Sequence, residues 1–336
     1  MTESQLIEAA IAGHEGAFAE LVEPHRRPLI AHCYRMLGSL QDAEDALQET
    51  LLRAWRGLSS FQGRSLLRSW LFTIATNACL RAIERRRSRV LPIDYAAPGD
   101  PHGSLREPLL ESVWVEPYPD DQLGIDDGLA GPEARYEQRE SIELAFIAAL
   151  QHLPARQRAV LILREVLGFS GAEVAEALDT TPASVYSALQ RAHATLDERR
   201  PDRTQQATLR SLGDEQLRGI VERYVEAWGQ ADVDAIVGML TETATLAMPP
   251  IPSWYRGRDA IEIVLRRFVF DGTRSWRMLA TSANGQLAVG AYERDPSGVY
   301  APHGVTVLTL SGALINEITH FRDPSMNRWF GLPARA

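Results

Sequence analysis

The stretch Asp42-Ala43-Glu44-Asp45-Ala46-Leu47-Gln48-Glu49-Thr50, continuing as Leu51-Leu52-Arg53-Ala54-Trp55, predicts a helix with two different faces. At helical spacing its apolar stripe consists of Ala43, Leu47, Leu51, Ala54 and Leu58. The carboxylates of Asp42, Asp45 and Glu49 line another face of the same helix. Charged rows are common on solvated helices, so this pattern alone favours a solvated face and a binding face about equally.

Two motifs after this helix favour a binding face. Phe61-Gln62-Gly63-Arg64 is followed by the helical run Ser69-Trp70-Leu71-Phe72-Thr73-Ile74-Ala75-Thr76-Asn77-Ala78-Cys79-Leu80-Arg81, which closes on Arg85-Arg86-Arg87-Ser88-Arg89. With the acidic helix, these motifs resemble region 2 of bacterial sigma factors. The resemblance implies that the acidic helix docks on core RNA polymerase, at the beta-prime clamp, through the side chains of Asp42, Asp45, Gln48 and Glu49.

The same resemblance assigns residues 61 to 81 to opening and reading the promoter minus-10 element. The implied DNA contacts are Phe61, Arg64, Asn77 and Arg81. Capturing an extruded base must recover the few kcal/mol that unstacking costs, and an aromatic side chain suits that task. Trp70 is expected to pack between helices. The Arg-rich end at 85 to 89 is expected to contact phosphates, although it could instead only complement the helix dipole.

A second helical module is predicted between residues 135 and 203. Thr181 is a strong N-cap and Pro182 suits the first helical turn, while Val185 and Ala192 face inward at helical spacing. A short turn at Asp179-Thr180 before this helix gives the layout of a helix-turn-helix, although an ordinary surface helix of a bundle has the same pattern.

This module resembles sigma region 4. The resemblance is carried by Ser170-x-x-Glu173-Val174-Ala175 and Thr181-x-x-Ser184-Val185-x-Ser187-Ala188-Leu189-x-Arg191-Ala192. It implies a contact with the polymerase beta flap and recognition of the minus-35 element through Thr181, Ser184, Tyr186, Ser187, Gln190 and Arg191. Tyr186 is a departure, because relatives often carry a basic residue at this position.

The pattern changes to an α+β domain from residue 204 onward. Helices are followed by alternating strands, clearest at 287–293, 304–310 and 314–321. The segments Val221-x-x-Tyr224-x-x-Ala227-Trp228 and Trp254-Tyr255-Arg256-Gly257-Arg258-Asp259-Ala260-Ile261 resemble the SnoaL-like branch of the NTF2-like superfamily, which implies a cone with a pocket.

Candidate pocket residues are the aromatic and titratable side chains Tyr224, Trp228, Met248, Trp254, Tyr255, His303, His320 and Asp323. Relatives of the fold include cyclases and isomerases with an Asp or His base, so His303 or Asp323 could serve as a base. The alternative, which is favoured here, is that these residues are core aromatics and satisfied polar groups.

The predicted fold class is therefore multidomain, with two all-α modules and a C-terminal α+β cone. The predicted divisions are 1–89 for region 2, 90–134 for an acidic, Pro-rich linker, 135–203 for region 4 and 204–336 for the SnoaL-like domain. Residues 90–138 carry eleven acidic residues and two Arg, so the net charge of this segment is −9. This value equals the net charge of the whole chain. Within this linker, Val113-Trp114-Val115-Glu116-Pro117-Tyr118-Pro119-Asp120 is too aromatic for a pure spacer and is expected to dock.

Composition narrows the function. The sequence shows no signal-peptide pattern and no apolar run of membrane-spanning length, which predicts a cytoplasmic protein. Cys33 and Cys79 lack metal-ligand spacing and are expected to be reduced, buried thiols. No metal, cofactor or enzymatic activity is expected.

The resemblance as a whole is to the small extracytoplasmic-function class of sigma factors. The fused domain and the acidic linker, which could lie in a basic polymerase channel or shield the DNA-binding faces, lead to the hypothesis that the C-terminal domain regulates the two modules intramolecularly. One alternative is a bifunctional factor whose SnoaL-like domain binds or converts a small apolar ligand. A plain helix-turn-helix repressor is a third hypothesis, but it leaves the acidic helix without a role.

Overall fold

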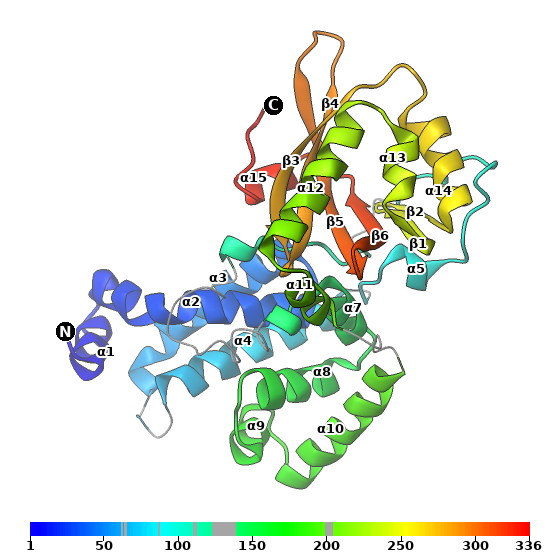
Figure 1. Ribbon diagram of the computed structural model, residues 1–336. Coiled ribbons are helices and arrows are strands. Elements are labelled where there is room, and N and C mark those ends of the chain that lie inside the picture. The colour runs from blue at the N-terminus through cyan, green and yellow to red at the C-terminus, as the bar shows by residue number, and fades with distance from the viewer. Residues whose placement is uncertain (62, 64–65, 87, 110–112, 123–138, 199–203) are drawn as a thin grey trace. The chain divides into compact units, whose positions relative to one another are not determined.

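The computed structural model describes residues 1–336 apart from 62, 64–65, 87, 110–112, 123–138 and 199–203. The chain forms two compact units (Figure 1). The N-terminal unit comprises Met1–Arg89, Asp121–Ser141 and Ala145–Arg200. The C-terminal unit comprises Val90–Asp120, Ile142–Leu144 and Pro201–Ala336.

The first module of the N-terminal unit is helical. Its helices are α1 Glu3–Ile11, α2 Glu15–Leu37, α3 Leu40–Gly57 and α4 Leu67–Glu84. Gly38 adopts the left-handed conformation that ends α2, and the Ser39 hydroxyl then accepts a hydrogen bond from the Asp42 amide to start α3. The apolar stripe of α3 is buried against α2 and α4, which orients the acidic stripe.

The second module contains the predicted helix-turn-helix. Its helices are α7 Leu144–Gln151, α8 Ala155–Leu161 with a π-helical turn at Ile162–Val166, α9 Gly171–Ala177 and α10 Pro182–Asp197. A capping box between Ser170 and Glu173 starts α9, and the Thr181 hydroxyl accepts from the Ser184 amide to start α10. Asp179 takes the left-handed conformation in the turn between them.

The C-terminal unit is built on one mixed sheet of six strands in the order β2-β1-β6-β5-β4-β3. Its strands are β1 Leu240–Met248, β2 Ile251–Arg256, β3 Trp276–Ala283, β4 Gln286–Arg294, β5 Tyr300–Ser311 and β6 Leu314–Phe321. β1 and β6 pair in parallel, and the other neighbours are antiparallel. The remaining helices are α5 Pro92–Tyr95, α11 Gln205–Leu212, α12 Asp214–Gly229, α13 Val233–Gly238, α14 Arg258–Val264 and α15 Met326–Trp329. Helix α12 packs on β3 and α14 on β1, as Figure 1 shows.

The acidic, Pro-rich segment after the first module packs against this sheet over its described residues. Val90 and Trp114 form a parallel bridge, and the Gly99 amide donates to the Trp254 carbonyl at 2.7 Å. Val115 and Tyr118 are completely buried, so the aromatic piece of the segment docks as expected. The composition predicts a spacer here, but a few buried anchors suffice to order a segment whose average composition is polar.

The turn between β3 and β4 gathers three separate segments of the C-terminal unit. The Asn284 side chain accepts from the Tyr118 amide at 2.9 Å and donates to the Ile142 carbonyl at 2.7 Å. Gln286 accepts from the Leu144 amide at 2.9 Å. The Glu143 carboxylate accepts from the backbone amides of Gln205 and Gln206 at the start of α11. We call Glu143 and Asn284 to Gln286 the clamp.

Candidate functional site

The structure separates Asp42 from the rest of the acidic row on α3. Asp42 is buried and forms ion pairs with Arg86 and with Arg89, the latter at 2.7 Å. Asp45 and Gln48 are exposed, and Glu49 is half-exposed beside Arg53. The carboxylate of Asp42 is thus engaged within the module, whereas Asp45, Gln48 and Glu49 form an accessible polar face. We call these three residues the acidic face.

We predict that Asp42 supports the fold while Asp45 does not. Asp42→Ala removes a carboxylate that pairs with the 95%-buried Arg89, which should cost about 3 kcal/mol of unfolding free energy. Asp45→Ala should change that free energy by less than about 0.5 kcal/mol. Urea denaturation of the two variants measures both values, and equal losses would contradict the distinction.

The predicted minus-10 residues lie around the start and the middle of α4. Phe61 packs on Trp70 with ring centroids 5.1 Å apart, and Asn77 and Arg81 are partly exposed on α4. Arg64 lies outside the described residues. Arg81 also borders a groove of about 260 Å³ between α3 and α4, where the acids Asp45 and Glu49 face it. The structure thus brings the acidic face and part of the predicted DNA-contacting set to neighbouring surfaces of one module.

All six predicted minus-35 residues are exposed on α10. Val185 and Ala192 are buried on the opposite side of this helix, against α8 and α9. The exposed set is Thr181, Ser184, Tyr186, Ser187, Gln190 and Arg191. The Tyr186 ring lies against Gly171 at the start of α9, where an added Cβ would stand 3.3 Å from the hydroxyl oxygen. Tyr186 therefore packs against its own module while remaining 54% exposed.

The two helical modules contact each other within the N-terminal unit. The Arg68 guanidinium on α4 donates to the Leu167 carbonyl at 2.8 Å and stacks on Phe169, while Ser69 donates to Glu173 at 3.3 Å. Phe72 and Phe169 pack edge to face. The second module thus engages the Arg68 side chain.

A buried arginine forms the centre of this contact. Arg158 on α8 donates to the Met36 carbonyl at the end of α2, and also to the side chain and carbonyl of Gln151 and the carbonyl of Leu153. Burial lowers the pKa of Arg158 to about 10, so the guanidinium remains charged at neutral pH. It satisfies carbonyl groups of both modules at once.

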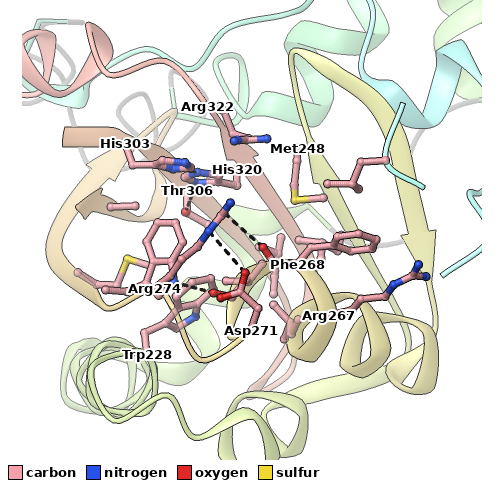
Figure 2. A pocket seen from close by; sticks show the side chains of 18 of the residues that line it. Trp228, Met248, Arg267, Phe268, Asp271, Arg274, His303, Thr306, His320 and Arg322 are labelled. Atoms are coloured by element: carbon pink, nitrogen blue, oxygen red, sulfur yellow. Dashed lines mark hydrogen bonds and ion pairs between the residues drawn. The ribbon is translucent and has the colours of Figure 1, made fainter. Parts of the chain in front are cut away.

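The C-terminal unit encloses a cavity of about 170 Å³ (Figure 2). Of the predicted pocket residues, Tyr224, Trp228, Met248, His303 and His320 line it. Trp254 does not, because its indole donates to the Ala96 carbonyl of the docked segment at 2.6 Å. Asp323 and Tyr255 also lie outside the lining: the Asp323 carboxylate accepts from the Ser325 amide in a turn, and Tyr255 packs beside Gly99.

Sequence reasoning missed the charged residues of the cavity. Arg267, Asp271, Arg274 and Arg322 all line it. Figure 2 shows Arg274 reaching across the cavity toward Asp271 and Phe268, with Arg322 beside His320. Asp271 and Arg274 come from the loop before β3, and Arg322 follows β6, so no local spacing connects them.

The histidines form a hydrogen-bonded chain at one end of the cavity. His303 Nδ1 lies 2.9 Å from His320 Nε2, and His320 Nδ1 lies 2.8 Å from the Thr306 hydroxyl. The rings are stacked, and His303 Nε2 lies 3.8 Å from Glu293. Burial lowers the pKa of His303 to about 4, and burial together with His303 and Arg322 holds the pKa of His320 well below 6.5. Both rings are neutral at pH 7.

Stability should therefore fall as the pH is lowered from 7 to 5. The unfolded histidines titrate near 6.5 while the folded ones do not, so unfolding takes up protons in this window and acid favours the unfolded chain. Between pH 7 and 5, His303 alone should contribute a loss of about 2 kcal/mol. This loss begins near the unfolded pKa and reaches its full value only near the folded pKa of about 4. Urea denaturation of wild type and His303→Gln at both pH values measures it, and an equal acid loss in both proteins would contradict the assignment.

Three family models match the chain. Sigma-70 region 2 matches residues 21–89, Sigma-70 region 4 matches 143–196, and a SnoaL-like domain matches 221–318. The chain is 42% identical to the ECF RNA polymerase sigma factor SigG of Mycobacterium tuberculosis, over 95% of this chain and 84% of that protein. The chain belongs to the extracytoplasmic-function (ECF) RNA polymerase sigma factors. It is also 31% identical to the ECF sigma factor SigM of the same species, over 58% of this chain and 83% of SigM.

A solved structure matches the fold over nearly the whole chain. The crystal structure of the M. tuberculosis ECF sigma factor SigJ matches with a TM-score of 0.54 at 22% identity, covering 92% of this chain and 97% of that chain. The predicted fold class is confirmed: helical sigma regions 2 and 4 and a fused SnoaL-like domain with a mixed sheet. In this ECF sigma factor, region 2 is the first helical module and region 4 the second.

Among the described residues, no cluster of three or more His, Cys, Asp or Glu side chains is arranged to hold a metal ion. Within the same part of the chain, no helix is both long and apolar enough to cross a membrane.

Proposed function

We propose that this ECF sigma factor docks on core RNA polymerase through its acidic face and directs the enzyme to promoters that are read by α4 and α10. The observation that carries this proposal is the division of α3, which buries its apolar stripe and leaves Asp45, Gln48 and Glu49 accessible. An accessible acidic row gains affinity from a basic partner surface without any cost to the fold. The relatives named above are sigma factors, so catalysis by regions 2 and 4 forms no part of the proposal.

Capture of a minus-10 base would use the Phe61 region. The packing of Phe61 on Trp70 provides a ready aromatic surface, and Asn77 follows two helical turns after Trp70 on α4. An extruded base stacked there would recover about 1–3 kcal/mol, which is comparable to the cost of unstacking it. On α10, Gln190 and Arg191 carry the donors that suit base edges or phosphates in the major groove.

The contact between regions 2 and 4 supports intramolecular regulation. The two promoter elements are centred about 25 base pairs apart, as their names imply, or about 85 Å along B-DNA. Region 2 and region 4 touch through Arg68, Phe169 and Arg158, so both elements cannot be read while these contacts persist. We infer that this contact represents a closed form, which must open before the chain can bind both promoter elements.

The C-terminal unit is positioned to control this opening through chain connectivity. Val90, directly after region 2, is paired with Trp114 in the C-terminal unit, and the residues on both sides of region 4 are held by the clamp. If the segment Val90–Asp120 were released, it could extend by up to about 100 Å, enough to let the two regions separate. We infer that docking of these segments favours the closed form.

Reconstitution tests the proposed function. The full chain is mixed with core RNA polymerase, the complex is isolated, and promoters are mapped by footprinting on genomic fragments. We expect a stable complex that protects both a minus-10 and a minus-35 element. Tight duplex binding by the chain alone, without polymerase, would instead indicate a helix-turn-helix repressor. A second role, small-molecule binding by the C-terminal domain, is favoured by the cavity.

A further inference from the structure

The cavity of the C-terminal unit is apolar at one end and cationic at the other. Its interior is closed by buried residues, among them Tyr224, Met278 and Ile318. The other end holds Arg274, Arg322 and the histidine chain, and there the Arg274 side chain is 38% exposed. A ligand that fits would place an apolar body inside and a polar group at this mouth.

The charges at the mouth are arranged for an anion. Arg274 is shared between Asp271, Glu293 and the Phe268 carbonyl. Arg322 has no hydrogen bond and no ion pair from its side chain to any described residue. Burial and the nearby Arg274 lower the pKa of Arg322. The charged form of this guanidinium is therefore disfavoured by desolvation and by repulsion from Arg274. A carboxylate placed between the two arginines would relieve both effects.

The remaining polar groups of the cavity do not offer a site for a cation. The Asp271 carboxylate already accepts from the amide and hydroxyl of Thr273, and these bonds lower its pKa. The two histidines are neutral and bonded to each other and to Thr306. Three arginines against one aspartate line the cavity, and Arg267 is engaged by the carbonyls of His102 and Gly103.

Size and shape limit the apolar body. A cavity of about 170 Å³ is close to the roughly 150 Å³ that accommodates a benzene molecule in a protein core. Trp228 and Trp276 pack at 88° to each other, and Trp276 meets the His303 ring edge to face, which leaves flat aromatic walls. Such walls suit a ring better than a chain.

We propose that this cavity binds a compact aromatic carboxylic acid of about benzoate size, with its ring against Trp228 and Trp276 and its carboxylate between Arg274 and Arg322. The site involves neither of the two sigma regions. The result of testing this site is therefore independent of whether the function proposed above is correct.

The docked segment after region 2 forms one wall of this site. Leu105 lines the cavity. Arg267, on the π-helical turn Leu265–Val269 that follows α14, donates to the neighbouring carbonyls of His102 and Gly103. A bound acid would therefore contact the docked segment directly and stabilise its docking by linkage. This connects occupancy of the cavity to the segment that joins the two sigma regions.

Binding is tested on the full chain by calorimetry with benzoate and with benzamide, its neutral analogue of the same shape. We expect benzoate to bind with a dissociation constant below about 1 mM and benzamide to bind at least about tenfold more weakly. Equal affinity for the two compounds, or no binding of benzoate up to about 10 mM, would overturn the proposal.

Two variants separate the roles of charge and wall. Arg322→Met keeps an apolar stem and should remove the preference for benzoate, leaving benzamide affinity unchanged. Leu105→Ala should weaken both compounds to a similar extent, because it removes apolar contact and leaves the arginines in place. If Arg322→Met left the preference intact, the assignment of the carboxylate would be wrong. Thermal melting shows whether each variant folds. If either variant does not fold, the comparison of benzoate and benzamide on the wild-type chain still tests the proposal.

Discussion

Replacing Asp45 and Glu49 by arginine is expected to abolish assembly of this sigma factor with core RNA polymerase. Both side chains are accessible, so the double reversal replaces attraction to a basic partner surface with repulsion. Like-charge contacts cost several kcal/mol, so affinity should fall about a hundredfold or more. Co-purification with core enzyme and a fluorescence titration of holoenzyme formation measure the loss.

The matched control is Glu23→Arg on α2. Glu23 is also an exposed acid of region 2, and its only neighbour of opposite charge among the described residues is Arg26 at 3.8 Å. It lies outside the acidic face, so its reversal should leave holoenzyme formation unchanged. Circular dichroism must show that both variants fold. Intact assembly of Asp45→Arg/Glu49→Arg would remove the physical basis of the proposed docking.

Helices and strands followed from the sequence because their signals are local. Caps at Ser39, Ser170 and Thr181 lie next to periodic apolar stripes, and these features agree on where α3, α9 and α10 begin. Each signal involves residues within one or two helical turns. Tertiary contacts therefore did not displace the helix starts that these local signals indicate.

The role of Asp42 shows where local reasoning ends. Helical spacing places Asp42 on the same row as Asp45 and Glu49, but the partner that buries its carboxylate is Arg89, 47 residues away. No periodicity in the sequence reports such a pairing. The assignment of Asp45, Gln48 and Glu49 to polymerase docking stays a prediction, and the structure adds only that these side chains are accessible, with Glu49 paired to Arg53.

Only the part of the cavity lining that comes from a single helix could be predicted from the sequence. Tyr224 and Trp228 are one helical turn apart on the inner face of α12, so an aromatic pair facing the sheet could be expected. Arg274 and Arg322 come from the ends of different strands, and arginine occurs throughout this lysine-free sequence. Only the order of the strands in the sheet brings them together.

In the proposed regulation, the contact between regions 2 and 4 and the clamp act on the same equilibrium. Arg158 and Arg68 hold region 2 and region 4 together, and the clamp holds the segments that would have to extend. Weakening either should raise the population of the open form. The clamp is the better target, because Arg158 is buried and its loss would leave four acceptors unpaired and reduce stability.

Releasing the clamp is expected to increase promoter binding and transcription. Asn284→Gly preserves the left-handed turn but removes the bonds to Tyr118 and Ile142, and Glu143→Ala removes the carboxylate that accepts from the start of α11. Together these losses should weaken docking of the segments by about 3 kcal/mol. A part of this free energy is enough to shift the equilibrium between closed and open forms about tenfold toward the open form. Transcription with core enzyme at limiting sigma factor should rise about tenfold.

The control for this experiment is Asn316→Ala, which removes a side-chain hydrogen bond to Thr241 inside the C-terminal unit and leaves the clamp in place. It should not change transcription. Truncation after Arg200 extends the test, because it removes the clamp residues on the sheet together with the rest of the C-terminal domain. If clamp release and truncation both left activity and promoter occupancy unchanged, docking of these segments would have no regulatory role. If both lowered them, the C-terminal domain would instead be needed for promoter binding, and the sign of the proposed regulation would be reversed.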